Sequence, residues 1–394
     1  MSTLTPDRWF NCGRSALPAA FEAGAEATAA ALAGEDPRLV IVFADFDYDQ
    51  EELMRGVCSR IGPDVAVAGC TTNGQVGREL PVDGSVIVAA LGGKGFEVRL
   101  AVGRAVGDDC RQAGHEAAAA VAELSSPHQA LLLLMDGLIG AQEDVVRGAY
   151  ATVGARVPLV GGCAADNLHW AKTYQFAGTG AGVEIVSGAA VGVAIGSSGP
   201  LGVGVAHGWD AFGEAMMVTG SEGGRLYELD GRPALGVYLE RTGADPALTE
   251  DEQAFRFFAL DHPLGLSRRD AKDLRVIHGT ETADGSLTCL ADVPSGALAW
   301  LMKTDREGLM RGAEEACQTA VAGLGGAEPL GVLAFDCGVR KVMLGEEDRA
   351  EEVERISASI GHKPFAGFYT FGEIARTNGA RGMHHLTMVV LAFA

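Results

Sequence analysis

The residues best suited to binding a small molecule lie close together near the C-terminal end of the sequence. Cys337, Arg340, Tyr369, Thr370 and Glu373 fall within or beside one strand–helix–strand–turn segment. An arginine fork can grip a carboxylate through two parallel hydrogen bonds, so Arg340 is a candidate to bind a ligand or to pair with Glu373. The tyrosine ring would form a wall of such a site. These residue types predict recognition of a small polar ligand.

Two earlier turns of the chain carry further polar candidates. Asn73 lies in the first turn, and Asp166 and Asn167 lie in the second. The three turns open with Gly69, Gly162 and Gly367, and glycine at a strand end lets a ligand approach backbone N–H groups. None of the turns matches a nucleotide-binding glycine motif, so a phosphate-binding loop is not expected. Cys70 and Cys163 are expected at equivalent positions in two of the turns.

Histidine and cysteine patterns give little support for metal chemistry or catalysis. His384 and His385 enter the last strand, and either imidazole is a candidate metal or haem ligand. The remaining histidines show no HExxH spacing, and the eight cysteines include no CxxC pair. A GxSxG nucleophile motif is also absent from the sequence. No catalytic residue is therefore predicted.

One unit recurs three times along the chain, and its strands and helices would position these residues. Buried strands are expected over residues 39–45, 131–136 and 331–336, each ending in an aspartate. A helix, a short strand with the glycine turn, and a closing strand follow each of them. The second and third copies begin further upstream, near residues 96 and 297. The pattern predicts an α/β fold of layered mixed sheets built from repeated strand–helix–strand–turn–strand units.

The chain is long enough for two domains. A segment rich in glycine and turn signals, roughly residues 199–296, separates the second and third repeats. The expected division is an N-terminal segment over residues 1–30, a first domain over residues 31–225 and a second domain over residues 226–394.

Composition and charge narrow the class of partner. The formal net charge of −21 repels phosphate backbones and anionic lipid, so nucleic acid and membranes are not expected partners. The N-terminus carries no apolar signal region, and no apolar run approaches the ~20 residues that span a bilayer. The expectation is a cytoplasmic protein.

Several stretches of the sequence resemble the FIST family, with its N-terminal and C-terminal regions in tandem. They include Gly69–Gly74, Val160–Asn167, Tyr227–Leu235, His262–Gly265 and Gly367–Ile374. The resemblance implies a sensory, small-ligand-binding module of signal transduction, with amino acids or their derivatives as ligands. Some members resemble haem-carrying nitric-oxide sensors that regulate histidine kinases in trans. In those proteins a C-terminal histidine, here matching His384, would hold the iron, although this chain reads Met383-His384-His385 where the family has aromatic-His-Asn.

Three functional hypotheses follow. The favoured one is a non-enzymatic intracellular sensory protein that binds a small ligand and signals to a separate partner, such as a histidine kinase. The second is a haem-binding nitric-oxide sensor that uses His384 or His385. The third is an enzyme of unrecognised class, which would need a nucleophile and a base held within hydrogen-bond reach.

Overall fold

The computed structural model describes residues 8–78, 84–104, 109–267, 272–376 and 382–394. The chain forms two compact units. Unit 1 comprises residues 1–206, 312–383 and 387–394, and unit 2 comprises residues 207–311 and 384–386. Unit 1 holds the three repeats, while unit 2 is inserted into the third. The predicted domains 1–30, 31–225 and 226–394 stay a prediction about sequence regions, and the compact units are a separate division.

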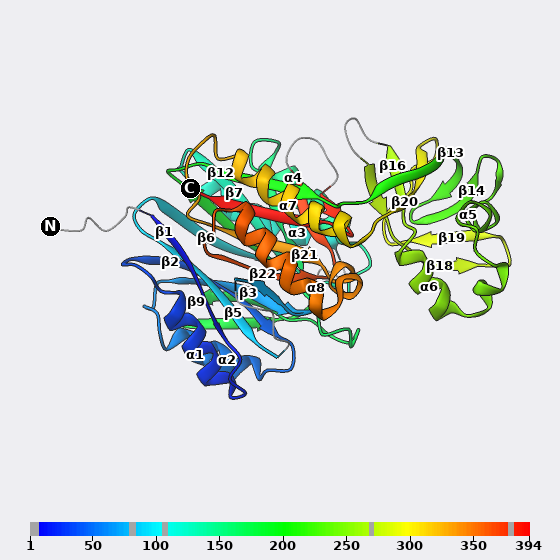
Figure 1. The fold of residues 1–394 in the computed structure, drawn as a ribbon. Helices are drawn as coiled ribbons and strands as arrows, with labels where there is room; N and C mark the ends of the chain where they lie inside the picture. The colour runs from blue at the N-terminus through cyan, green and yellow to red at the C-terminus, as the bar shows by residue number, and fades with distance from the viewer. Residues whose placement is uncertain (1–7, 79–83, 105–108, 268–271, 377–381) are drawn as a thin grey trace. The chain divides into compact units, whose positions relative to one another are not determined.

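The three repeats share the order strand, helix, strand, helix, strand, turn and closing strands (Figure 1). The first contains β1 (Trp9–Ser15), α1 (Ala20–Ala31), β2 (Pro37–Asp45), α2 (Gln50–Cys58), β3 (Ala66–Thr72), β4 (Gln75–Gly77) and β5 (Val86–Gly92). The second contains β6 (Phe96–Gly103), α3 (Cys110–Ala118), β7 (His128–Met135), α4 (Gln142–Val153), β8 (Leu159–Cys163), β9 (Gln175–Thr179), β10 (Gly182–Val186) and β11 (Ala190–Ser197). The third contains β12 (Leu201–Ala206), α7 (Arg306–Ala322), β21 (Gly331–Cys337), α8 (Gly338–Ser359), β22 (Phe365–Thr370), β23 (Glu373–Arg376), β24 (Met383–His384) and β25 (Met388–Phe393).

The third repeat starts at β12, so the prediction of a start near residue 297 was wrong. The apolar stretch at that point forms β20 (Leu298–Lys303), which pairs with strands of unit 2. Sequence alone placed the strand correctly but could not show that about one hundred residues interrupt the repeat, because an insertion leaves the local hydrophobic pattern unchanged. The first repeat also has its upstream strand and helix, β1 and α1.

Each repeat builds the centre of one sheet. In every case the middle strand pairs in parallel with the strand before the turn and antiparallel with the closing strand. The strand after each turn leaves its own sheet and joins that of another repeat: β4 pairs with β22, β9 with β3, and β23 with β8. This exchange of strands ties the three repeats together, and it confirms the predicted α/β fold of layered mixed sheets.

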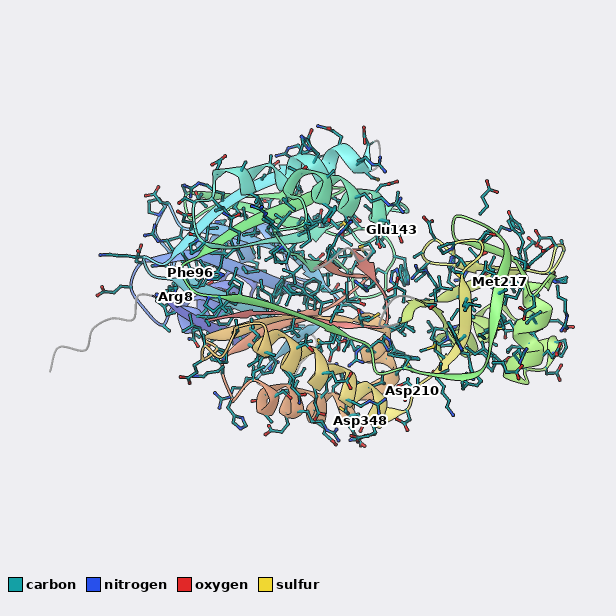
Figure 2. All side chains as sticks on the ribbon, turned by 90° about the horizontal axis from the view of Figure 1, so that it is seen from above. Arg8, Phe96, Glu143, Asp210, Met217 and Asp348 are labelled. Carbon is teal, nitrogen blue, oxygen red and sulfur yellow. The ribbon has the colours of Figure 1, made fainter. Side chains whose placement is uncertain are left out.

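The middle strands are apolar throughout because both of their faces are buried. Along β2, Leu39, Ile41 and Phe43 enter a core that all three sheets share, while Val40 and Val42 pack beneath α1 and α2. The strands β7 and β21 alternate in the same way, under α3 with α4 and under α7 with α8. Side chains fill the space between these layers (Figure 2). Successive residues along each middle strand therefore face the shared core and the helix layer in turn.

Unit 2 forms an eight-stranded antiparallel sheet with its own core. Its elements are β13 (Asp210–Glu222), β14 (Arg225–Leu229), β15 (Arg232–Pro233), α5 (Ala234–Thr242), α6 (Glu252–Leu260), β16 (Leu264–Ser267), β17 (Lys272–Arg275), β18 (Ile277–Glu281), β19 (Ser286–Cys289) and β20. Tyr238, Phe255 and Ile277 are fully buried there. Across the described part of the chain, no helix combines the length and the apolarity needed to cross a bilayer.

Candidate functional site

The same close backbone contact identifies equivalent glycines in the three turns. A Cβ atom at any of them would lie 1.8–2.1 Å from a carbonyl oxygen of the neighbouring middle strand, so no larger residue fits. The glycine–carbonyl pairs are Gly69 with Val42, Gly161 with Leu133, and Gly367 with Ala334. The second turn is therefore anchored by Gly161, one residue earlier than the predicted Gly162.

Three backbone hydrogen bonds join the turns into a closed ring. In each, the residue two positions after the glycine offers its carbonyl oxygen to an N–H of another repeat. The bonds are Ala165 N to Thr71 O at 2.9 Å, Phe371 N to Cys163 O at 3.2 Å, and Asn73 N to Tyr369 O at 3.1 Å. Each turn gives one bond and receives one, so the ring has approximate threefold symmetry.

This register corrects two predicted equivalences. Cys163 corresponds to Thr71 and Tyr369, so Cys70 and Cys163 do not occupy matching positions. At the strand ends, Cys337 is the counterpart of Asp45 and Asp136, while Asp336 lies one residue earlier. Since side chains alternate along a strand, Asp336 faces the helix layer and the other two aspartates do not. The sequence pattern missed this because an aspartate ends each apolar run.

The aspartates of the first two repeats stabilise local turns. Asp45 accepts from the backbone N–H of Asp47 and of Gly84, each at 3.0 Å. Asp136 accepts in the same way from Leu138 at 2.8 Å and from Gly188 at 2.9 Å. Their carboxylates are thus fully engaged in loop structure.

The Glu373 carboxylate is hydrogen-bonded by other groups of the protein. Its Oε1 accepts from Thr370 Oγ1 at 2.6 Å, and its Oε2 accepts from Thr387 N at 3.1 Å and Oγ1 at 2.8 Å. Burial raises the pKa of Glu373 to about 8, although the hydrogen bonds from Thr370 and Thr387 oppose the rise. Threonine, glutamate and threonine therefore form a closed polar cluster at the third turn.

The first repeat contains the neutral counterpart of this cluster. Gln75 donates from Nε2 to Thr72 Oγ1 at 3.0 Å and accepts from Ser85 Oγ at 2.8 Å. Gln75 and Glu373 each follow their turn glycine by six residues, and Ser85 and Thr387 occupy the matching place before the closing strand. The same position in the fold is thus occupied by an amide, Gln75, in the first repeat and by a titratable acid, Glu373, in the third.

Arg340 forms a buried ion triad with two acids. Its Nε lies 2.6 Å from Asp336 Oδ1, its Nη2 lies 2.6 Å from Glu352 Oε1, and all three side chains are inaccessible to solvent. Burial, and then the Asp336 charge, raises the pKa of Glu352 to about 8 despite the Arg340 cation. Burial also raises the pKa of Asp336, although the Arg340 cation opposes the rise. Arg340 is therefore paired with these two acids rather than with Glu373.

Two buried donors beside this triad have no hydrogen-bond partner among the described residues. They are the Nδ2 amide of Asn73, a residue that is 3 % exposed, and the hydroxyl of the fully buried Tyr369. Burial raises the pKa of Tyr369, so its hydroxyl keeps its proton. The Lys341 ammonium lies 2.9 Å from Asn73 O and 5.6 Å from the centre of the Tyr369 ring. Lys341 thus contacts the Asn73 backbone and the face of the Tyr369 ring near the start of α8.

Asp166 and Asn167 shape the loop after the second turn. The Asp166 carboxylate accepts from three backbone N–H groups, of Trp170, Ala171 and Lys172. Asn167 donates to Asp45 Oδ1 at 2.9 Å, which joins the second repeat to the first. The loop has positive φ at Asn167, Leu168 and Trp170 and stacks the exposed indole of Trp170 on Phe371, with ring centres 4.5 Å apart.

His384 groups with unit 2, whereas the other predicted site residues belong to unit 1. Its neighbour His385 is buried, and its pKa is lowered to about 3 by burial and by the charges of Arg275, His384 and His278. Among the described residues, no group of three or more metal-ligating side chains comes together.

Sequence reasoning missed three residues of the buried cluster. Lys341 directly follows Arg340, and no spacing in the sequence marks it as part of a site. Asp336 and Arg340 are four residues apart, a spacing that predicts an ion pair within a helix, but the sequence predicts Asp336 as the last residue of a strand. Glu352 lies in a stretch dense with acids, Glu346 to Glu354, where no pattern marks one of them as buried.

The cysteines near the turns are unsuited to nucleophilic chemistry. Burial raises the pKa of both Cys70 and Cys163 well above the usual value, so their thiols stay protonated. The arrangement around the third turn instead offers hydrogen-bond donors and a cation, which are groups that bind.

Two domain families match most of the chain. The FIST N domain matches residues 38–232, and the FIST C domain matches residues 234–376. An uncharacterized protein of Mycobacterium tuberculosis is 27 % identical over 215 residues, which are 53 % of this chain and 55 % of the relative. An uncharacterized protein of Methanocaldococcus jannaschii is 29 % identical over 160 residues, 38 % of this chain and 30 % of the relative. The chain thus spans about half or less of the length of these relatives.

A solved structure gives a weaker likeness. The cyanuric acid hydrolase of A. caulinodans covers 98 % of this chain and 99 % of its own, with 11 % identity and a TM-score of 0.35. So low a TM-score carries no argument about chemistry. The two adjoining domain matches identify this chain as a member of the FIST family, with the FIST N and FIST C domains in tandem.

Proposed function

We propose that this FIST protein is a non-enzymatic sensory module that binds a small carboxylate-bearing ligand, such as an amino acid, beside its third turn. The family assignment supports a sensory role. Signalling would pass to a separate partner, for which a histidine kinase is one candidate.

The observation that carries the proposal is the pair of unpartnered donors, Asn73 Nδ2 and Tyr369 Oη, on the two residues that the Lys341 ammonium contacts. A buried donor without a partner costs about 1–3 kcal/mol, and a bound water or ligand that completes the hydrogen bond removes this cost. Two donors and a cation suit the two oxygens of a carboxylate.

In this proposal the ligand-contacting residues differ from the anchors that the sequence favoured. Arg340 and Glu373 are saturated by internal partners, so they hold β21, α8 and the third turn in place. Asn73, Tyr369 and Lys341 would contact the ligand. Asp166, Asn167, Thr370 and Cys337 remain proposed members of the surrounding shell.

Access to the buried donors is proposed to come from movement of the first part of α8. The helix is interrupted at Gly345, where φ is +67° and ψ is −174°. That conformation is essentially restricted to glycine, so residue 345 is suited to act as a hinge. Asp348, labelled in Figure 2, lies three residues beyond it. Closure of the segment 338–344 on the ligand would give the partner a changed surface to read.

Tyr369→Phe is the sharpest test, because it removes a hydroxyl that the folded chain leaves unpartnered. Thermal shift and calorimetry against a panel of amino acids and their derivatives should give one or more hits with wild type. The variant should keep or raise the melting temperature yet bind about threefold to tenfold more weakly, as loss of ~0.5–1.5 kcal/mol implies. Lys341→Gln should weaken binding further.

Tyr238→Phe is the matched control. The Tyr238 hydroxyl donates to the carbonyl of His262 at 3.0 Å in unit 2, so its removal should lower stability and leave binding unchanged. No hit anywhere in the panel, or a hit that binds wild type and Tyr369→Phe equally, would count against the proposal. A Soret band on haem addition that His384→Ala abolishes would favour the haem alternative instead.

A further inference from the structure

The buried ion triad leaves two carboxylate oxygens without a hydrogen bond. Asp336 Oδ1 and Glu352 Oε1 each accept one from Arg340, at 2.6 Å. The second oxygen of each acid, Asp336 Oδ2 and Glu352 Oε2, has no hydrogen-bond partner among the described residues, although both side chains are fully buried. A buried acceptor without a partner is as unfavourable as a buried donor without one. A bound group that donates to these two oxygens would therefore gain favourable hydrogen bonds.

These acceptors lie on the same face of the third sheet as one of the unpartnered donors. Asp336 and Tyr369 are direct partners in the parallel register of β21 and β22, so their side chains point to the same side of the sheet. The helix α8, which carries Glu352, packs on both strands (Figure 1). Burial, and then the charges of Glu352 and Asp336, raise the pKa of Tyr369, so its phenol is within electrostatic reach of both acids.

Glu352 is the group of this layer that can release a proton near neutral pH. Charged and titratable neighbours of Asp336, Glu352 and Tyr369 are Glu373 on β23, Cys317 on α7, and Arg340 and Arg349 on α8. Burial raises the pKa of Cys317 to about 12, and the phenol also keeps its proton. Both oxygens of Glu373 already accept hydrogen bonds. Glu352, with a pKa of about 8, combines a proton with an unpartnered oxygen.

The triad is electrically balanced while Glu352 holds its proton, because the Arg340 cation then faces one anion, Asp336. An additional cation in this buried layer would leave an uncompensated charge, which is costly away from water. Ionisation of Glu352 removes that excess charge. The layer can therefore accept one cation in exchange for one proton.

An ammonium group has the chemistry that this exchange requires. It carries one positive charge, and its N–H groups can donate to two carboxylate oxygens at once. A metal ion would need more ligands, and among the described residues no group of three metal-ligating side chains comes together. We propose that an ammonium group binds Asp336 Oδ2 and Glu352 Oε2 and displaces the Glu352 proton to solvent, so that the third-turn site recognises a zwitterion. This inference rests on the proposed function, because the carboxylate of the same molecule would bind Asn73 and Tyr369.

The test compares amino acids with the same molecules lacking the amine. The probes are L-alanine, L-leucine, L-glutamate and L-phenylalanine, paired with propionate, 4-methylpentanoate, glutarate and 3-phenylpropionate. Calorimetry of the full chain at pH 7 in phosphate and in Tris, which take up protons with different heats, counts the protons released. At least one amino acid should release about 0.9 protons per molecule bound, the fraction that a group with a pKa of about 8 still holds. Its partner without the amine should bind about tenfold or more weakly and release none.

The pH dependence of binding gives an independent readout. Below pH 8 a ligand that displaces a proton binds about tenfold more tightly for each unit of rising pH, so the amino acid should bind about tenfold more tightly at pH 7 than at pH 6. Glu352→Gln keeps the shape of the side chain but cannot ionise, so it should abolish both the proton release and this pH dependence. Glu354→Gln replaces an exposed acid on the same helix and should change neither. Circular dichroism checks that both variants fold.

The outcomes separate this inference from the proposed function. An amino acid that binds no better than its partner without the amine, or that binds without releasing a proton, overturns the ammonium site and leaves a carboxylate-binding sensor standing. Proton release that persists in Glu352→Gln also overturns the inference, because another group then supplies the proton. If none of the eight probes binds, the inference fails, and the wider panel of amino acids and derivatives decides the proposed function.

Discussion

Replacing Glu373 with glutamine should stabilise the protein, and increasingly so as pH rises. The first repeat shows why the substitution fits: Gln75 already makes the equivalent bonds to a threonine and a serine. In Glu373→Gln the new amide would donate to Thr370 Oγ1, and its oxygen would accept from Thr387. The exchange therefore removes a titratable group while keeping the hydrogen bonds.

The magnitude follows from the pKa of Glu373, which is raised from 4.5 to about 8 in the folded protein. Between those values the folded chain keeps a proton that the unfolded chain releases, so wild-type stability falls as pH rises through this window. The full difference is roughly 5 kcal/mol, at ~1.4 kcal/mol for each pH unit that separates the two pKa values. The variant should exceed wild type by about 1 kcal/mol at pH 5, about 3 at pH 7 and about 5 at pH 9.

Urea unfolding followed by circular dichroism at these three pH values measures the free-energy difference. Glu352 titrates in the same direction, so the variant keeps part of the wild-type slope. The reciprocal variant Gln75→Glu is the matched control: it places an acid in the first repeat and should add a loss of stability that grows with pH. Parallel curves for wild type and Glu373→Gln would refute the reasoning, because they would mean that Glu373 does not hold a proton in the folded state.

Two further variants test the buried layer beneath α8. Arg340→Met should lower the free energy of unfolding by about 3–5 kcal/mol, since it leaves two buried acids without their cation. Arg355→Met should cost less than about 1 kcal/mol, because the Arg355 side chain is 23 % exposed to solvent. Chemical denaturation at neutral pH compares the two variants, and similar values would contradict a buried triad. Gly345→Ala should lower the free energy of unfolding by about 1–3 kcal/mol, because the φ of +67° with ψ of −174° at this position suits only glycine. Gly236→Ala, inside α5 and facing open space, should raise it by up to ~1 kcal/mol. Equal shifts in melting temperature for the two variants would argue against strain at Gly345.

The sequence predicted the repeat because hydrophobic strands and glycine turns leave a local mark. Strands at 39–45, 131–136 and 331–336 could be read directly, since each is apolar on both faces. The exchange of β4, β9 and β23 between sheets could not, because strand pairing over long distances has no local signal. The insertion of unit 2 into the third repeat could not be predicted either, because it too has no local signal in the sequence.

For the candidate site, too, the sequence predicted some features and not others. Tyr369, Thr370 and Glu373 were singled out by residue type and lie on the strands that flank the third turn. Arg340 was singled out with them, but it lies in α8 and pairs with Asp336 and Glu352. The internal hydrogen-bond and ion-pair partners of these side chains could not be predicted from the sequence. Whether an arginine binds a ligand or an internal acid depends on which face of β21 Asp336 occupies, and one residue of register decides this.

A crystal structure of the protein with the strongest ligand of the amino-acid panel tests the central claim most directly. We expect ligand density at the start of α8, with a carboxylate within hydrogen-bond distance of Asn73 Nδ2 and Tyr369 Oη and beside the Lys341 ammonium. Ordered water on those two donors, with the ligand bound elsewhere, would contradict it.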